Sequence, residues 1–327
     1  MSPKFGLQES DPNAPPPPVN KCDVFDFTKL RRYKAKRKEW LDWYGFQKGE
    51  PNSIEGQIVQ MTFEDMSYRM MTKPRVEAPQ DVNISARSLL LAHMLDVGYA
   101  ARQVLAIRRL LDKGSHVMSM QRLLNNIKAN RHLITRENYV AHDGKPYDPD
   151  GYESLPASPD IQMFGVDAPV FFGYLMSGER HKVFDKLSGV PAANRSRTDL
   201  ISEKIFDRLE SWLRSAEAEK LVTLSHKFFA HAADAATRGN LTHASFPFSD
   251  VEKAQRAIVR VERAITDDIL FIGVAREVVA SEPLGFLNRL DSPYVTTEMI
   301  AKMDAHWDEL KAERNTWSKG YENDLYS

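Results

Sequence analysis

The sequence predicts an all-α protein, a helical bundle with a loop-rich insertion and extra terminal helices. In several long segments apolar residues recur at intervals of three and four, which is the period of one buried helix face. No segment alternates apolar and polar residues as a half-buried strand does, and no repeat at solenoid spacing is present. A chain of 327 residues with 42% hydrophobic residues can bury a substantial core.

The first 53 residues divide into two segments. Residues 1–21 contain a run of four prolines, so we expect a disordered or polyproline lead-in. Residues 22–53 are basic and aromatic and allow two interpretations: cations and rings that bind nucleic acid, or an apolar stripe that docks a helix on the body while the cations stay solvated. The nucleic-acid-binding candidates are Arg31, Arg32, Lys34, Arg37 and Lys38, and the docking candidates are Leu30, Tyr33, Trp40 and Tyr44.

Residues 54–282 are expected to form the bundle. Its first clear helix spans about residues 90–111 and ends in a turn at residues 113–115. Ser119 is placed to cap the next helix, because a serine side chain accepts a hydrogen bond from a backbone N–H of the first turn. The expected buried residues are Leu90, Met94, Val97, Ala101, Val104, Ile107 and Leu111 in the first helix and Leu123, Leu124 and Ile127 in the second.

An insertion interrupts the helical period between about residues 143 and 197. It opens with turn-forming residues, and its apolar stretch is short and interrupted, so we expect one or two short helices there. The period resumes at Thr198, a candidate cap. The residues expected to face the core after it are Ile205, Leu209, Trp212, Ala216, Leu221, Leu224 and Phe228.

The clearest helix follows Ser249, which has the spacing of a capping box with Glu252. Residues 283–327 are expected to be a C-terminal helical extension, a connector followed by a last helix. The buried seam of the first of these helices comprises Val251, Ala254, Ile258, Val261, Ile265, Ile269 and Ile272, and the last helix would carry Met303, Trp307 and Leu310.

Composition and missing motifs exclude several functions. The 44 basic and 45 acidic residues give no general attraction for nucleic acid, and no apolar run is long enough to span a membrane. Cys22 is the only cysteine and no secretory signal is present, so we expect a cytoplasmic protein. Di-iron and zinc histidine motifs, phosphate loops, dinucleotide-binding glycines and nucleophile elbows are absent, so we predict no metal and no cofactor.

The segment LSHKFFAHAAD, residues 224–234, contains two histidines. On an α-helix His226 and His231 would point about 140° apart, so they would not share one metal ion. One interpretation is ordinary packing, with one histidine satisfied at a helix interface and the other solvated. The other interpretation is an active site.

Three pieces of sequence favour the active-site interpretation: AIRRLLDK at 106–113, MSMQRLL at 118–124 and SHKFFAH at 225–231. Their order resembles the HEPN superfamily of helical-bundle proteins, particularly its branch linked to bacterial abortive infection. The resemblance covers about residues 55–280, interrupted by the insertion. It implies a metal-independent ribonuclease of a defence or toxin type, with RNA as its substrate.

The resemblance also implies a site, an arginine followed after four to six residues by a histidine and completed by a second protomer in a homodimer. The imidazole would transfer protons to and from ribose and leaving-group oxygens, and the arginine would stabilise phosphorane charge. His231 falls on the motif histidine, with Lys227 and His226 nearby. Ser225 stands at the arginine position, and lysine cannot reproduce the bidentate fork of arginine. The alternative is a non-catalytic HEPN-like bundle that binds a regulatory protein partner.

The motif spacing also occurs at four arginine–histidine pairs, but chance alone gives roughly two for so loose a pattern, so the spacing by itself does not identify a site. The pairs are Arg87 with His93, Arg109 with His116, Arg136 with His142, and Arg238 with His243. Arg136 and His142 are the second candidate catalytic pair, because they lie at a helix end beside a polar loop. Their alternative role is structural, in anchoring the insertion.

Overall fold

The computed structural model describes residues 21–46, 50, 52–77, 89–154, 168–230 and 248–272, and several positions between 302 and 313. The chain divides into two compact units, residues 1–280 and residues 281–327. The first unit is an all-α helical bundle, as the sequence predicts. Over its described residues no strand occurs, and an isolated β-bridge joins Thr135 to Leu200.

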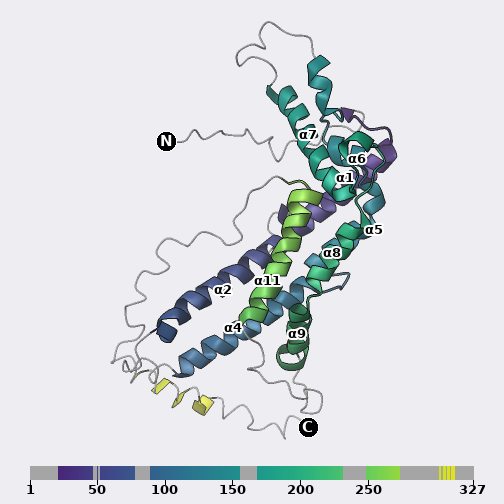
Figure 1. Ribbon diagram of the computed structural model, residues 1–327. Coiled ribbons are helices and arrows are strands. Elements are labelled where there is room, and N and C mark those ends of the chain that lie inside the picture. The colour runs from purple at the N-terminus through teal and green to yellow at the C-terminus, as the bar shows by residue number, and fades with distance from the viewer. Residues whose placement is uncertain are drawn as a thin grey trace, which may run out of the picture. The chain divides into compact units, whose positions relative to one another are not determined.

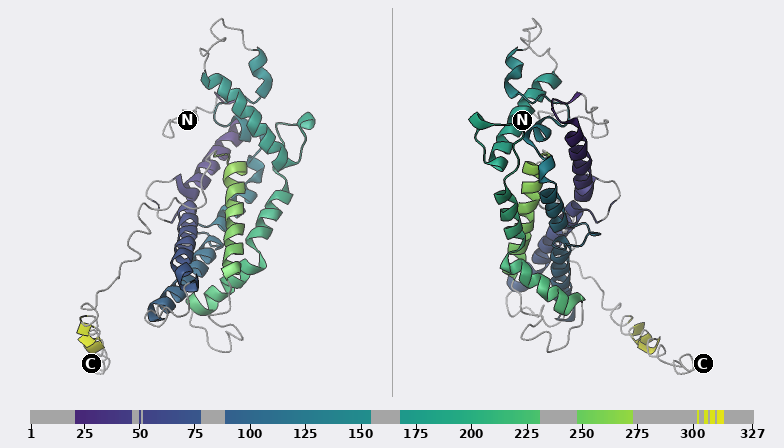
Figure 2. Two further views of the ribbon diagram at one scale, coloured as in Figure 1. Left: turned by 60° about the vertical axis from the view of Figure 1, so that its left-hand side comes forward. Right: turned by 90° about the vertical axis from the view of Figure 1, so that its right-hand side faces the viewer.

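The body of the first unit consists of helices that lie side by side (Figures 1 and 2). They are α2 (Ile54–Glu77), α4 (Leu89–Leu110), α8 (Glu203–Leu213), α9 (Ala216–Leu224) and α11 (Phe248–Arg263). α2 packs against α4, and α4 packs against α9 and α11. Because α11 also contacts α8 and α9, it links both sides of the bundle.

The basic N-terminal segment forms a helix, α1 (Phe27–Leu41), followed by a π-helical turn, η2 (Asp42–Phe46). Asp26 caps α1 by accepting a hydrogen bond from the Lys29 N–H at 2.8 Å. The indole N–H of Trp40 donates to Asn126 Oδ1 at 2.9 Å. The buried residues of the segment include Leu30, Tyr33, Trp40 and Tyr44, so the helix is docked as the second interpretation expects.

Helix α4 confirms the predicted span but buries only part of the predicted face. Val104 and Ile107 are fully buried, whereas Met94 and Val97 are exposed. Tyr99 and Gln103 are buried instead. An apolar period shows which residues share a face, but it does not show how much of that face a neighbouring helix covers.

The turn after α4 and the start of α5 (Met120–Ala129) agree with the sequence. Ser119 is the N-cap, and its hydroxyl accepts a hydrogen bond from the Arg122 N–H at 3.1 Å. Leu123, Leu124 and Ile127 are fully buried, as predicted.

The insertion contains a longer helix than the sequence predicts. α7 (Ala168–Ser188) packs against α6 (Arg136–Ala141) and against a 3-10 turn, η4 (Pro149–Ser154). A Cβ atom at Gly173 would lie 3.4 Å from Pro146, and one at Gly178 would lie 3.6 Å from Pro149. This close approach shows that tertiary packing stabilises a helix that its glycines disfavour.

The prediction that the next helix is capped by Thr198 is wrong. α8 begins at Glu203, with Ser202 at its N-cap, and it ends at Leu213 before α9 begins at Ala216. The segment before α8 is instead tied to α6, because the Asp199 carbonyl accepts a hydrogen bond from the Arg136 N–H at 2.9 Å. The side chain of Phe228 lies outside the described residues.

Helix α11 and the π-helical turn that continues it, η8 (Ala264–Ile269), bury the predicted seam from Val251 to Ile269, whereas Ile272 lies beyond the turn and is half-buried. The helix begins at Phe248, so Ser249 lies inside its first turn rather than at the expected capping position. Tyr44 donates from its hydroxyl to Glu262 at 2.5 Å, which satisfies a buried carboxylate on this helix. Burial raises the pKa of Glu262.

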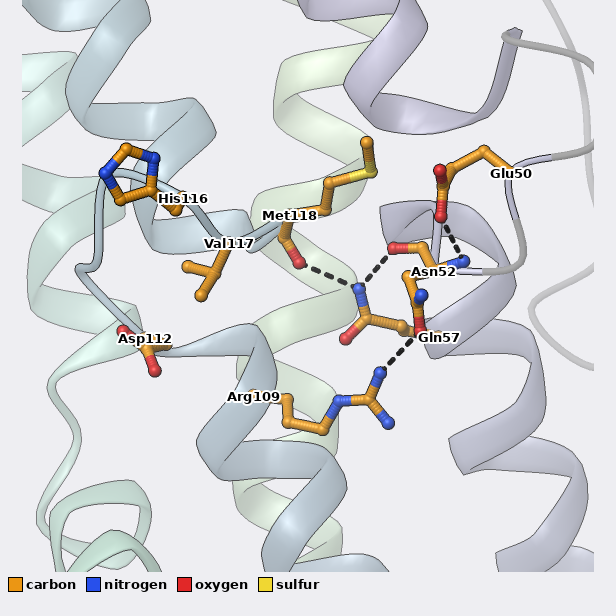
Figure 3. A pocket seen from close by; sticks show the side chains of 8 residues that line it. All are labelled: Glu50, Asn52, Gln57, Arg109, Asp112, His116, Val117 and Met118. Carbon is orange, nitrogen blue, oxygen red and sulfur yellow. Dashed lines mark hydrogen bonds between the residues drawn. The ribbon is translucent and has the colours of Figure 1, made fainter.

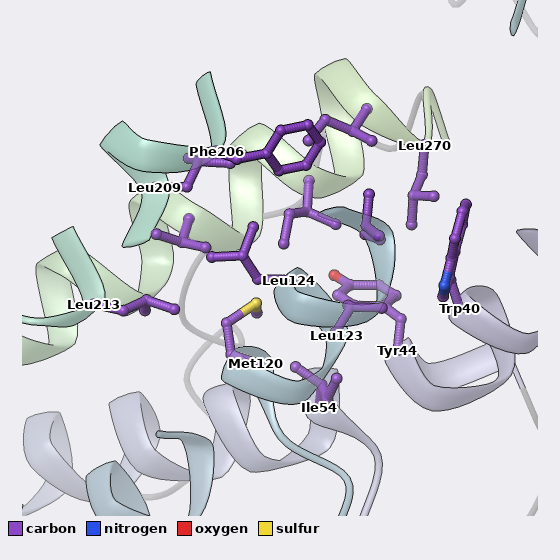
Figure 4. Packing of buried hydrophobic residues seen from close by; sticks show 14 of the residues in the cluster. Trp40, Tyr44, Ile54, Met120, Leu123, Leu124, Phe206, Leu209, Leu213 and Leu270 are labelled. Carbon is purple, nitrogen blue, oxygen red and sulfur yellow. The ribbon is translucent and has the colours of Figure 1, made fainter. Parts of the chain in front are cut away.

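The core is continuous from α1 to the end of η8. Figure 4 shows side chains from α1, α2, α5 and α8 packed in one cluster, with Leu270 at its edge near Trp40. The labelled core residues are Trp40, Tyr44, Ile54, Met120, Leu123, Leu124, Phe206, Leu209, Leu213 and Leu270.

In the second unit, the described positions between 302 and 313 are helical, as predicted for a last helix. The side chains of Met303, Trp307 and Leu310 lie outside the described residues. Among the helices that the structure describes, none has the length and apolarity needed to cross a membrane.

Replacing Trp40 with alanine is expected to lower the free energy of unfolding by about 3–5 kcal/mol, because it opens a cavity in the core and leaves Asn126 without its donor. Chemical denaturation followed by circular dichroism measures the change. The exposed Lys38, on the opposite side of α1, is the control, and Lys38→Ala should change stability by less than about 0.5 kcal/mol. Equal stability of the two variants would show that α1 is not docked.

Candidate functional site

The histidine segment lies at the end of α9, where the chain enters a π-helical turn, η7 (Ser225–Ala230). His226 is exposed and Lys227 is half-buried, whereas Ser225 is fully buried. His231 lies outside the described residues. The predicted separation of about 140° between His226 and His231 therefore involves a residue outside the described part of the chain.

Ser225 bears directly on the motif. Its side chain is buried and its hydroxyl has no hydrogen-bond partner. An arginine at this buried position would have to place its charge in the interior, which is costly without a partner. The geometry therefore supports packing at position 225.

Arg136 is fully buried in a set of polar partners. Its Nη1 lies 2.7 Å from Asp185 and its Nε lies 2.8 Å from Asp199. Its Nη2 donates to the Ser188 hydroxyl at 3.2 Å. These contacts join α6 to the end of α7 and to the segment before α8, which is the anchoring role left open by the sequence.

His142 is also buried, in a different environment. Its ring meets the ring of Tyr33 edge-on, with centroids 5.6 Å apart, and its Nδ1 lies 3.2 Å from the Tyr139 carbonyl oxygen. Burial lowers the pKa of His142 well below its ordinary value, and the charges of Arg37 and Arg180 lower it further. The imidazole is therefore neutral near pH 7.

A buried ion pair holds the chain next to His142. Two N–H groups of Arg180 donate to the two oxygens of Asp143, each at 2.8 Å, and one of them also donates to the Val140 carbonyl at 2.7 Å. Burial would raise the pKa of Asp143, but the hydrogen bonds and the charge of Arg180 hold it below its usual range. No sequence pattern indicates that residue 180 meets residue 143.

Arg136 and His142 do not form one site. Six positions along a helix place two residues about 120° apart, and these two share no partner. Arg136 contacts the two carboxylates described above, and His142 packs against α1. Their spacing matches the motif, but each side chain makes its own separate buried contacts.

Three of the five candidate nucleic-acid-binding residues take part in contacts within the fold. Arg37 donates to the Leu270 carbonyl at 2.7 Å, Lys34 lies 3.5 Å from the Cys22 sulfur, and Lys38 pairs with Asp42 at 2.6 Å. Arg31 and Arg32 are exposed. Arg32 also lines a cavity of about 230 Å³ with Lys36 and Asn130.

Arg109 and His116 line the same cavity. Both are exposed and both line a cavity of about 370 Å³ at the end of α4 (Figure 3). Figure 3 shows His116 and Asp112 on one side of this cavity and Glu50 and Asn52 on the other. Two of the other pairs with the motif spacing fall wholly or partly outside the described part of the chain. Arg87 lies outside it, as do both Arg238 and His243.

The walls of this cavity are fixed by hydrogen bonds of amide groups. The Gln57 side-chain amide donates to the Asn52 carbonyl at 2.7 Å and to the Met118 carbonyl at 2.8 Å. Arg109 Nη2 donates to Asn52 Oδ1 at 2.8 Å. We call this set, Asn52, Gln57 and Met118, the amide latch. It joins the start of α2 to the turn before α5, and no sequence pattern pointed to it.

A second cavity of about 200 Å³ adjoins the first and shares Gln57 and Arg109 with it. Its other walls come from α2 and α4 and include Glu64 and Arg102, which form an ion pair. Arg109 thus stands where the two cavities meet.

Over the described ranges, no three His, Cys, Asp or Glu side chains are grouped closely enough to hold a metal ion. No family model, curated protein or solved structure matches this chain.

Replacing Arg136 with methionine is expected to lower the free energy of unfolding by about 3–5 kcal/mol, because it leaves Asp185 and Asp199 without their buried partner. Urea denaturation measures the effect. Arg31→Met, at an exposed position of α1, is the matched control and should change stability by less than about 0.5 kcal/mol. A stable Arg136→Met variant would contradict the anchoring role.

Stability is expected to fall as the pH drops below about 6.5, the ordinary histidine pKa. The pKa of His142 is lowered in the fold, so below pH 6.5 the unfolded chain binds a proton that the folded chain does not. The loss from this residue reaches at most about 1.4 kcal/mol per pH unit. Denaturation curves at several pH values, compared with His142→Gln, isolate it. Identical slopes for the two proteins would rule out the buried neutral imidazole.

Proposed function

We propose that the protein is a metal-independent endoribonuclease built on a HEPN-like helical bundle, of a bacterial defence or toxin type. In this proposal it acts in the cytoplasm as a homodimer. The observation that carries the proposal is the cavity at the end of α4, where Arg109 and His116 have the motif spacing and line the same space.

The chemistry requires one proton to leave and another to arrive. The ribose 2′-oxygen forms a bond to phosphorus as its proton passes to a base, and the bond to the 5′-oxygen breaks as that oxygen gains a proton. An imidazole serves either step, because its ring nitrogens can accept a proton and donate one. Arg109 forms no ion pair among the described residues, so its charge is available to a phosphorane.

The segment from His226 to His231 is retained in the proposal as the site to which the sequence resemblance points. Lys227 and His226 would supply positive charge beside His231. In a homodimer, a second copy of either site is available, as the resemblance implies. The exposed Arg31 and Arg32 would add to the affinity for the RNA backbone.

A second candidate function is the non-catalytic binding of a regulatory protein partner. The burial of Ser225 at the expected arginine position favours it. So does the use of Arg136 and His142 in separate buried contacts. In this case the protein would leave RNA intact.

Incubation of the purified protein with total RNA in the presence of EDTA tests the proposal. The wild-type protein should cleave RNA, and His116→Ala should reduce the rate at least about 100-fold, because a positioned acid or base contributes that much or more. His132→Ala, which alters an exposed histidine outside the cavity, should cleave like the wild type.

Three results would count against the proposal or change it. An inert wild-type protein would remove the enzyme claim and leave the partner-binding function. Cleavage that EDTA abolishes would contradict the metal-independent mechanism. Loss of cleavage in His231→Ala, with His116→Ala unchanged, would assign the chemistry to the histidine segment.

A further inference from the structure

The two adjoining cavities have one cation between them, so they suit a ligand whose two units are joined by a negatively charged group. The larger has a volume of about 370 Å³ and the smaller about 200 Å³, and the guanidinium of Arg109 borders both. The size of the larger one falls within the range of small-molecule sites. Two nucleotides joined by a phosphate form a ligand of this kind, since each nucleotide carries a flat ring system and the phosphate carries the negative charge.

Arg109 is the cation available to the phosphate. One of its N–H groups is used by Asn52 at 2.8 Å, which orients the guanidinium and leaves its other N–H groups for a ligand. Arg102, at the smaller cavity, is instead neutralised by Glu64, with Nε 2.9 Å from a carboxylate oxygen. Guanidinium groups bind phosphate oxygens with two parallel hydrogen bonds.

The larger cavity presents acceptors to the base. Asp112 accepts the Gly114 N–H at 2.7 Å, and Glu50 accepts the Asn52 N–H at 2.8 Å. In each carboxylate the backbone orients one oxygen, and neither carboxylate forms an ion pair within the described residues. An ionised carboxylate only accepts hydrogen bonds, so it favours a base edge rich in N–H donors.

Guanine fits this chemistry better than uracil. Guanine presents two adjacent N–H donors on its pairing edge, and a carboxylate can accept both. Uracil presents a single N–H between two carbonyl oxygens, which a carboxylate repels. Val117 and Met118 supply apolar contact for the ring.

We infer that the two cavities bind one step of an RNA chain, with guanine in the larger cavity and the bridging phosphate on Arg109. This inference rests on the proposed function, because it names the substrate of the same site. The base is selected by Asp112 and Glu50, and the phosphate is held by Arg109.

Isothermal titration of the full-length protein with GMP and with UMP tests the inference without requiring cleavage. GMP is expected to bind at least about tenfold more tightly than UMP, the lower end of the discrimination that a bidentate base contact provides. Asp112→Asn and Glu50→Gln should each reduce this preference, because they weaken the binding of GMP and remove the repulsion of the uracil carbonyls. Arg109→Gln should weaken the binding of both nucleotides about tenfold, because it removes the charge on the phosphate.

Arg208→Gln, an exposed cation of α8 outside both cavities, is the matched control and should bind GMP as the wild type does. Thermal unfolding of each variant checks its fold, which these partly exposed substitutions should preserve. Equal affinity for GMP and UMP, or GMP binding unaffected by Arg109→Gln, would overturn the inference.

The two proposals fail in different ways. Preferential GMP binding by a protein that leaves total RNA intact would refute the endoribonuclease and keep the cavity assignment. Cleavage of RNA that depends on His116, by a protein that binds GMP and UMP equally, would refute the guanine assignment alone.

Discussion

The apolar seam of α11 is the constraint on which the arrangement of the bundle depends. Val251, Ala254, Ile258 and Val261 are buried, and α11 contacts both the two helices that precede it, α8 and α9, and the more distant α4. Because α4, α8 and α9 all contact α11, burial of this one stripe fixes their directions together. The end of α4 is then held beside the start of α2, and this position allows Arg109 to face solvent across the cavity described above.

The sequence predicts the helical fold because amphipathic period is a local property. It predicts the α11 seam and the Ser119 cap for the same reason, since both involve residues within one or two turns. It does not predict where neighbouring helices stop covering a face, and so Met94 and Val97 are exposed. The length of α7 was missed because its support comes from prolines of a loop that packs on its glycines.

The candidate sites also show that local patterns can be predicted from the sequence whereas contacts between distant segments cannot. The spacing of Arg109 and His116 is visible in the sequence, but so are three other pairs whose spacing fits the same motif. This pair is distinguished by the cavity that it lines, because one wall of that cavity comes from the beginning of α2, about fifty positions earlier in the sequence. Arg136 and His142 were predicted as a site because they lie at a helix end beside a polar loop. Their side chains are instead buried, Arg136 against Asp185 and Asp199 and His142 against Tyr33, and no local pattern connects these partners to them.

The amide latch has a consequence for how this cavity responds to its surroundings. Its donors and acceptors are a carboxamide and two peptide carbonyls, none of which gains or loses a proton between acid and neutral pH. Protonation therefore neither makes nor breaks the hydrogen bonds that join the α2 wall to the turn before α5. Acid alone does not release this contact between two segments that lie about sixty positions apart in the sequence.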